Sequence, residues 1–420
     1  MNDLAARAPT DWASPAMTAR LAGRYAAERR FRWLGLGAIL VSGLFLAILL
    51  VSMTTSAVGG FQRTEVALPI DFPAMGLTID DARLRGPDAA QALAASGLPE
   101  ATGLSADRAF GPGGAAYIAD SAWTEIRDAM IADPSLLSQK ATISVPASDD
   151  LAAAARGEGS PELRAVHARL SQSGAVDDAW DAGFLTRSDA TDPGQVGIWG
   201  ALKGSMLTML VTLLLAFPIG VLSAVYLEEY APKNRWTDMI EVSINNLAAV
   251  PSIIFGLLGL AVFLSFMGLP RSAPLVGGMT LALMTMPVIV ISGRNAIKAV
   301  PPSIRDAALA IGASRVQVVF HHVLPLALPG ILTGTIIGMA RALGETAPLL
   351  MIGMRAFVAT PPDSLTAPSS VLPVQIFLWS DEVSRGFVER TSAAIVVLLV
   401  FLLAMNGLAI YLRNRFETRW

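Results

Sequence analysis

Residues 301–325 read PPSIRDAALAIGASRVQVVFHHVLP and lie between two long apolar runs. The two prolines at the start of this stretch stop the preceding helix, and Ser303 with Asp306 is predicted to cap the next one. Gly312 permits a bend between two short helices. Pro325 can begin a further helix, because the N–H that proline lacks would be unbonded there. The stretch therefore predicts two short helices joined at a glycine.

Six apolar runs, each near the ~20 residues that an α-helix needs to cross a bilayer, are spread along the chain. They cover residues 33–58, 197–226, 240–268, 275–292, 326–353 and 393–412. Hydrophobic residues make up 53% of the chain and charged residues 15%, against about 25% charged residues in soluble globular proteins. We therefore expect an all-α polytopic membrane protein with six transmembrane helices.

A long polar segment separates the first apolar run from the second. It holds 20 acidic and 10 basic side chains, which leaves 14 acidic and 21 basic side chains in the rest of the chain. An acidic soluble insert is thus joined to a cationic membrane part. The predicted parts are an N-terminal tail, a first helix, the insert, a membrane core and a C-terminal end, at 1–32, 33–58, 59–196, 197–412 and 413–420.

The positive charges predict the orientation of the chain. Arginines crowd before the first apolar run and follow the last one, and the loops 227–239 and 293–325 are also basic. Loops rich in Lys and Arg stay in the cytoplasm, so both termini and these two loops are expected there. The insert then lies in the periplasm, outside a bacterial inner membrane.

Prolines interrupt several of the apolar runs. Pro218, Pro251, Pro287 and Pro348 are predicted to kink their helices, because a proline ring removes one backbone hydrogen bond. Such kinks are tolerated in a membrane where the helix lines a cavity or packs on protein.

Two charged residues lie within the run 326–353. Arg341 and Glu345 are four residues apart, so they share a helix face and can pair. A charge at this depth costs at least about 2.5 kcal/mol on insertion scales and marks a candidate functional site. The planar fork of Arg341 matches phosphate oxygens, and Glu345 can accept a hydrogen bond from hydrogenphosphate that sulfate cannot donate. A purely structural ion pair is the alternative interpretation.

The stretch 301–325 resembles the EAA loop of ATP-binding-cassette (ABC) importer permeases, whose pattern is Glu-Ala-Ala, three residues, Gly and a later Leu-Pro. Here the pattern is carried by Asp306, Ala307, Ala308, Gly312, Leu324 and Pro325, with aspartate in place of the usual glutamate. The resemblance implies that these residues couple the chain to a separate ATPase. Alanines and glycine also offer a small-residue face that another protein can approach.

Further motifs resemble the PstA-type phosphate permeases. They are GIWGALKGS at 197–205, YLEEYA at 226–231, NLAAVPSIIFG at 246–256, RALGETAPLL at 341–350 and MNGLAIYLRNRF at 405–416. Together they cover about half of the chain and imply the type I ABC importer (MetI-like) permease fold. They also imply a phosphate pathway that includes Arg341, Glu345 and Thr346. The insert has no counterpart in the compact members of this family.

The same resemblance implies the partners. They are a PstC-type permease that completes a heterodimer, two copies of a PstB-type ATPase, a PstS-type periplasmic phosphate-binding protein and the lipid bilayer. The chain has no Gly-x-x-x-x-Gly-Lys-Ser/Thr loop for nucleotide phosphates. We therefore expect a transport subunit that carries inorganic phosphate, is not an enzyme and has no cofactor of its own, with ATP bound by its partners.

The composition argues against several other functions. The chain has no cysteine and three histidines, so no metal centre is expected, and no basic and aromatic pattern indicates nucleic acid. Two alternatives stay open. One is a permease for another oxyanion such as sulfate or molybdate, against which the motif at 344–348 argues. The other is a membrane sensor that uses the insert, for which the residues at 413–420 are too few to form an output domain.

Overall fold

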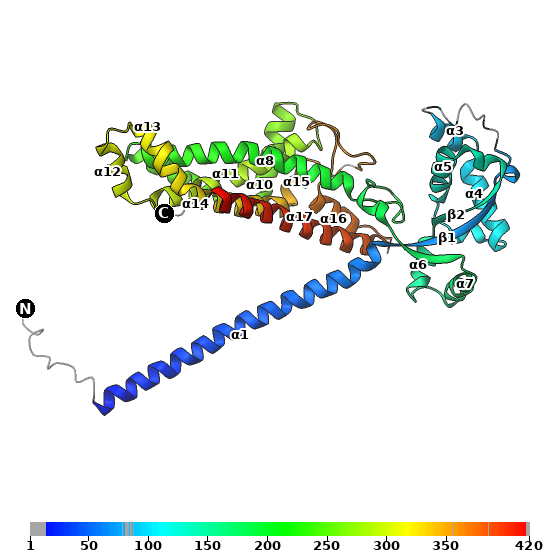
Figure 1. Ribbon diagram of the computed structural model, residues 1–420, viewed down its shortest axis with the longest axis horizontal. Helices are drawn as coiled ribbons and strands as arrows, with labels where there is room; N and C mark the ends of the chain where they lie inside the picture. The colour runs from blue at the N-terminus through cyan, green and yellow to red at the C-terminus, as the bar shows by residue number, and fades with distance from the viewer. Residues whose placement is uncertain are drawn as a thin grey trace, which may run out of the picture. The chain divides into compact units, whose positions relative to one another are not determined.

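The computed structural model describes residues 14–77, 79, 84, 86, 88–355, 357–384 and 386–416. The chain divides into two compact units, residues 1–55 and residues 56–420. Most of the described part of the first unit is α1 (Pro15–Gly60), the long helix coloured blue in Figure 1, whose last residues belong to the second unit. The second unit holds a small α/β domain and a bundle of apolar helices.

Helix α1 is 46 residues long and begins well before the predicted start at residue 33. Its first turns are rich in Ala, Arg and Glu, which favour helix, and Pro15 suits the first helical position. Arg32 also pairs with Glu28, one turn earlier, at 3.0 Å. The predicted tail at 1–32 is therefore helical from Pro15 onward, and residues 1–13 lie outside the described part.

Five helices of the described residues are long and apolar enough to cross a membrane, and a bent pair makes a sixth span. The five are α1; α8 (Trp199–Val225) with the π-helical η5 (Tyr226–Tyr230); α11 (Pro274–Lys298); α13 (Arg315–Val318), η7 (Val319–Val323) and α14 (Leu324–Gly344) in succession; and α17 (Gly386–Phe416). The bent pair is α9 (Arg235–Ala248) and α10 (Ser252–Gly259), continued by η6 (Leu260–Phe266). The expected polytopic, mostly helical membrane protein is confirmed, with six candidate spans if the bent pair is counted as one.

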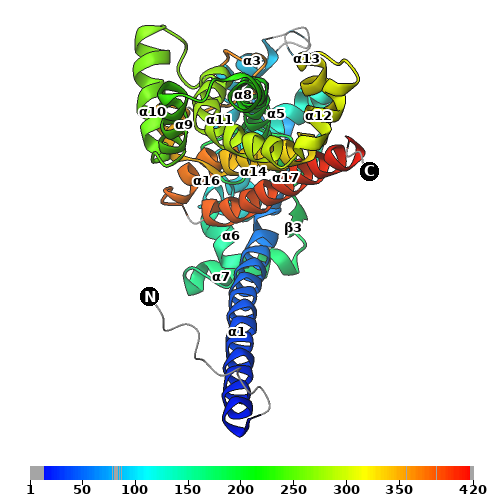
Figure 2. The ribbon, with the colours of Figure 1, turned by 90° about the vertical axis from the view of Figure 1, so that its left-hand side faces the viewer.

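Helix α11 packs against both α8 and α14, and α14 packs against α17 (Figure 2). Glycines permit these close approaches, as small residues do between membrane helices. A Cβ added at Gly278 of α11 would lie 2.5 Å from Val211 of α8, and one added at Gly334 of α14 would overlap Ser292 of α11. The bundle therefore depends on backbones that approach without side chains between them.

Three of the four predicted proline sites interrupt or lie within membrane helices. Pro218 and Pro287 lie inside α8 and α11. Pro251 separates α9 from α10, whose axes differ by 100°, because proline disfavours the helical conformation in the residue before it. The predicted single helix at 240–268 is therefore broken.

The prediction for Pro348 is wrong. Helix α14 ends at Gly344, and Pro348 lies in the first turn of a separate short helix, α15 (Ala347–Met351), so it kinks no membrane helix. A proline is well placed in a first turn, where its missing N–H has no helical partner. The predicted run 326–353 thus consists of two helices. Pro329, which was not predicted as a kink site, lies inside α14.

The polar segment after α1 folds as a three-stranded antiparallel sheet covered by short helices. The strand order is β2 (Lys140–Pro146), β1 (Gln62–Asp71) and β3 (Val176–Trp180), so β1 is central. The α-helices of this domain are α3 (Ala89–Ala95), α4 (Leu98–Phe110), α5 (Ala122–Ala132), α6 (Asp149–Ala155) and α7 (Pro161–Gln172). Its 3-10 turns are η1 (Phe72–Met75), η2 (Gly114–Tyr117), η3 (Pro134–Ser138) and η4 (Ala182–Leu185).

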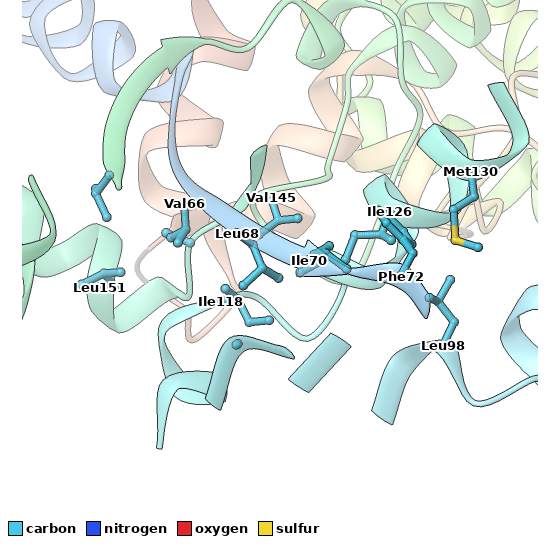
Figure 3. Packing of buried hydrophobic residues seen from close by; sticks show 14 of the residues in the cluster. Val66, Leu68, Ile70, Phe72, Leu98, Ile118, Ile126, Met130, Val145 and Leu151 are labelled. Atoms are coloured by element: carbon cyan, nitrogen blue, oxygen red, sulfur yellow. The ribbon is translucent and has the colours of Figure 1, made fainter. Parts of the chain in front are cut away.

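This domain has an apolar core of its own. Val66, Leu68 and Ile70 alternate along β1 and are at most 2% exposed, as expected for one face of a strand. Figure 3 shows their side chains in one cluster with Ile126 and Met130 of α5. The segment is therefore a packed domain rather than a loose linker.

Arg390, near the start of α17, joins this domain to the helix bundle. Its guanidinium is almost fully buried and donates to the carbonyl oxygens of Gly60 (2.7 Å) and Pro193 (2.9 Å) and to the carboxylate of Asp181 (2.8 Å). The same carboxylate also accepts a hydrogen bond from Arg187 at 2.6 Å. A buried charge is stable only when it is paired and hydrogen-bonded, so these contacts hold three segments at one point.

We expect Arg390→Gln to loosen this junction, because glutamine cannot satisfy all three acceptors. Each buried acceptor left unbonded costs about 1–3 kcal/mol. Arg187→Gln is the matched control, since Arg187 binds the same carboxylate but its side chain is 30% exposed. Limited proteolysis in detergent should cut Arg390→Gln faster than the control between the domain and the bundle. Equal cleavage rates for both variants and the unmodified chain would contradict this role of Arg390.

Candidate functional site

Residues 301–325 bend at a glycine, as predicted, but only the first of the two predicted short helices is separate. The second, α13, runs on through η7 into α14 as one helix from Arg315 to Gly344, so Pro325 lies within that helix and does not begin it. Helix α12 (Pro302–Ala310) is followed by Gly312, which has a φ of +91°, in the left-handed region that favours glycine. Helix α13 then begins with a capping box, in which the Ser314 side chain accepts from the backbone N–H of Gln317 and the Gln317 side chain accepts from the backbone N–H of Ser314. The sequence determines this bend locally.

The predicted cap of α12 is wrong. The helix starts at Pro302, with no side-chain hydrogen bond at its N-terminus, so neither Ser303 nor Asp306 caps it. The fixed φ of proline is already suited to the first helical position, so the helix starts before the serine. Asp306 is exposed, and Leu324 and Pro325 are half-buried at the start of α14.

The predicted small-residue face is divided between two sides of α12. Ala308 is buried against the helix bundle, whereas Ala307 and Gly312 are exposed. Two large apolar side chains lie beside them and are also exposed, Leu309 at 47% and Ile311 at 82%. Exposed apolar side chains that gather on one element are typical of a protein interaction site. The exposed face of α12 therefore offers such a site.

Ion pairs that were not predicted from the sequence lie at this end of the bundle, and one of them holds α12 to it. Glu229 Oε1 lies 2.7 Å from Arg305 Nη2, and Glu228 Oε1 lies 2.5 Å from Arg294 Nε. Arg294 also pairs with Glu241 of α9 at 2.7 Å. The signal in the sequence was a pair of adjacent glutamates at the end of an apolar run, since each of them needs a nearby cation.

Arg341 and Glu345 are paired, with Nε and Oε1 3.4 Å apart. Arg341 lies in the last turn of α14, where a cation is favourable, and Glu345 lies just beyond that turn with extended backbone. The pair therefore ends a helix instead of lying on one face of a continuous helix, as predicted from the spacing. Thr346 follows at the start of α15 and is half-buried.

The Arg341 side chain is 52% exposed and that of Glu345 is 21% exposed. Among the described residues, the guanidinium makes no further hydrogen bond beyond the one to Glu345. Arginine has five N–H donors in a planar fork, so most of them remain available to an anion. These donors are not part of a buried hydrogen-bond network among the described residues.

Two of the quoted motifs meet in space next to this pair. A Cβ added at Gly256 of α10 would lie 2.6 Å from the Cα of Pro348 in α15. The motif at 246–256 thus supports the one at 341–350. Within the described part of the chain, no group of three or more His, Asp or Glu side chains could hold a metal ion.

Comparison with protein families gives two matches. Residues 201–418, which are 218 of the 420 residues, match the family described as "Binding-protein-dependent transport system inner membrane component". Residues 18–165 match "Domain of unknown function (DUF3333)", which covers most of α1 and much of the α/β domain. The bundle and the α/β domain are therefore matched separately.

Several curated proteins are similar to the bundle. A probable ABC transporter permease protein, YqgI of Bacillus subtilis, is 32% identical over 206 residues, which are 46% of this chain and 69% of that protein. The phosphate transport system permease protein PstA of Yersinia pestis is 32% identical over 215 residues, 51% of this chain and 71% of that protein. PstA 1 of Mycobacterium tuberculosis is 31% identical over 49% of this chain and 66% of that protein.

Among solved structures, the MetNI methionine ABC transporter in an inward-facing conformation is similar with a TM-score of 0.41 and 18% identity, over 53% of this chain and 95% of that chain.

The matched region and the helix bundle define a membrane-embedded permease subunit of a binding-protein-dependent ABC transport system. Within that class, the chain belongs to the PstA family of permeases.

The bend of the α12–α13 loop should depend on the left-handed backbone of Gly312. Nothing lies within 4 Å of a Cβ added there, so a larger side chain meets no steric clash. A substitution at this position therefore acts only through the strain of a positive φ. We expect Gly312→Val to loosen residues 302–318, because β-branched residues are strained at positive φ. Gly312→Asn is the control, since asparagine tolerates this region. Hydrogen exchange of these amides should be faster in the valine variant only, and equal exchange in both would contradict the role of φ.

Proposed function

We propose that this chain is the transmembrane permease subunit of an ATP-driven inorganic phosphate importer and forms half of its translocation pathway. The observation that carries the proposal is the accessible Arg341–Glu345 pair at the end of α14. It lies within the motif at 341–350 that resembles the PstA permeases. Two relatives above 30% identity are named phosphate transport system permeases, which supports the same substrate for this chain.

The chemistry of the pair suits hydrogenphosphate. The guanidinium of Arg341 can donate two parallel hydrogen bonds to two phosphate oxygens. The carboxylate of Glu345 can accept a hydrogen bond from the P–OH group, which sulfate lacks at neutral pH. The hydroxyl of Thr346 follows directly and can donate to a third oxygen. One site would thus attract an anion and still reject a fully deprotonated competitor.

The exposed face of α12 supports coupling to an ATPase. Ala307, Gly312 and Ile311 lie on it, and the motif there resembles the EAA loop. Because this chain has no nucleotide-phosphate loop, ATP would be hydrolysed by two copies of a PstB-type partner. A PstC-type permease would supply the other half of the pathway, and a PstS-type protein would deliver phosphate.

The arrangement in the membrane follows from the same proposal. Family membership places the chain in the bacterial inner membrane, and the excess of Lys and Arg beside α12 and after α17 supports a cytoplasmic position for these ends. The acidic α/β domain would then lie in the periplasm. Its charge repels phosphate, so its acidic surface would face away from the pathway.

Arg341→Gln should abolish phosphate uptake while the complex still assembles, because the anion loses its fixed positive charge. Arg341→Lys should rescue uptake poorly, since a point charge lacks the bidentate fork. Arg271→Gln is the control, because Arg271 is an exposed arginine in a loop of the same bundle. Uptake of labelled phosphate into membrane vesicles measures all three. Normal transport by Arg341→Gln would show that the pair only holds the helix end in place.

Glu345→Gln should reduce the rate less and relax selectivity, because an amide can donate to a fully deprotonated oxyanion. A hydrogen bond to a charged group contributes enough free energy for about tenfold discrimination or more. We therefore expect excess sulfate to inhibit labelled phosphate uptake by the variant but not by the unmodified complex. If sulfate or molybdate competes equally in both, the permease serves another oxyanion and the proposed substrate is wrong.

A further inference from the structure

The end of the bundle that carries α12 contains a cluster of opposite charges that the proposed pathway does not use. It consists of glutamates from η5 and α9 and of basic residues from α11 and α12. The members are Glu228, Glu229, Glu241, Arg294, Lys298 and Arg305. Most of these side chains are largely buried, so the pairs are screened less by salt than surface pairs are. The cluster therefore joins four elements at one end of the membrane core.

Arg305 is the member that belongs to α12, and it makes more contacts than a simple ion pair. Its Nε and Nη2 donate to the carboxylate of Glu229 at 3.1 and 2.7 Å. Nη1 donates to the carbonyl oxygen of Val300 at 2.7 Å, and Nη2 donates to that of Ile297 at 3.0 Å. These two carbonyls lie at the C-terminal end of α11 and just beyond it, where carbonyl groups lack the usual helical partners. Arg305 thus binds η5, the continuation of α8, and the end of α11 at once.

The other charges of the cluster hold α8, α9 and α11 to one another. Arg294 of α11 lies between Glu228 and Glu241, and both it and Glu228 are only 10–12% exposed. Lys298 adds a longer contact to Glu228, at 3.4 Å. None of these three pairs includes a residue of α12. The pair Glu229–Arg305 is therefore the ionic link between α12 and the rest of the cluster.

On its other side α12 is held differently. The chain leaves α12 through the turn at Gly312, which is exposed and has a φ of +91°. No side chain packs within 4 Å of a Cβ added at this turn. Contacts toward α13 and η7 are apolar, and Ala308 lies in one apolar cluster with Val318 of α13 and Val323 of η7. Apolar contacts are non-directional, whereas the guanidinium–carboxylate contact fixes both distance and direction. A displacement of α12 would therefore be followed by α8 and α11 before α14.

We propose that Glu229 and Arg305 are positioning residues that transmit movement of α12 to α8 and α11, and so couple ATP hydrolysis to transport. The proposal rests on the proposed function, in which an ATPase docks on the exposed face of α12. Glu229 and Arg305 lie behind that face and are largely buried, so they act after docking. Loss of the pair would leave the ATPase bound but poorly coupled.

The first test uses the complete complex purified with its partner subunits. In Glu229→Gln, the ATPase should co-purify as before, and the number of ATP molecules hydrolysed per phosphate transported should rise about tenfold, as expected for a lost charged hydrogen bond. Glu241→Gln is the matched control, because Glu241 binds Arg294 and not α12. An unchanged ratio in Glu229→Gln would overturn the proposal, and so would loss of the ATPase, which would assign the pair to docking.

A second test restores the link by chemistry. The chain has no cysteine, so the double variant Glu229→Cys with Arg305→Cys carries one defined pair of thiols. Joining them with a short bismaleimide should return the ratio of ATP to phosphate toward that of the unmodified complex, and either single variant treated in the same way should stay uncoupled. If the joined double variant remains as uncoupled as the singles, a tether between α8 and α12 is not what coupling requires.

A third measurement does not depend on the transported anion. Spin labels on Leu222→Cys in α8 and Ala310→Cys in α12, both at exposed positions, report the distance between these helices. This distance should stay constant when ATP is added, and it should vary with ATP when Glu229→Gln is also present. A change in the labelled complex that keeps Glu229 would overturn the proposal. Absence of phosphate uptake by the unmodified complex would instead contradict the proposed function.

Discussion

In an apolar environment each backbone N–H and C=O must find its hydrogen bond within its own helix, and this constraint decides where the chain can carry chemistry. The bundle is helical throughout its apolar runs and departs from helix at a few sites. At Gly344–Thr346 the departure presents Arg341 and Glu345, at Gly312 it presents α12, and at Pro251 it lets α10 meet α15. Polar function is thus concentrated where the helices end, because the interior of a helix offers no free backbone group.

Charge is treated in two different ways in this molecule. At the junction with the α/β domain, Arg390 is almost fully buried and each of its three side-chain nitrogens donates a hydrogen bond, so it holds segments together. Arg341 is half-exposed and pairs only with Glu345 among the described residues. The first arrangement resists change, whereas the second leaves donors free for the proposed anion. The same side chain therefore serves structure or binding according to how many of its donors are satisfied.

Apolar length was enough to predict the candidate spans, and the proline and glycine pattern was enough to predict the bend at Gly312. Periodicity could not show that the run 326–353 ends one helix and starts another, because Gly344 and Glu345 break the helix without breaking the apolar run. The pairing of Glu229 with Arg305 joins residues 76 positions apart, which no local pattern encodes. The alternation of Val66, Leu68 and Ile70 was a visible strand signal, but Pro69 within it argues against a central strand.

The register of the sheet has a consequence for how the α/β domain is accommodated. Gln62, at the start of β1, pairs directly with Trp180, at the end of β3, so the polypeptide enters and leaves the domain at neighbouring points. A domain whose two ends meet in this way can be carried between successive helices without pulling them apart. The two chain segments that connect the domain to the rest of the protein are then separated by the width of one strand pair, however large the domain is. Because the two ends of the domain adjoin, one insertion or deletion can add or remove the whole domain during the evolution of a permease.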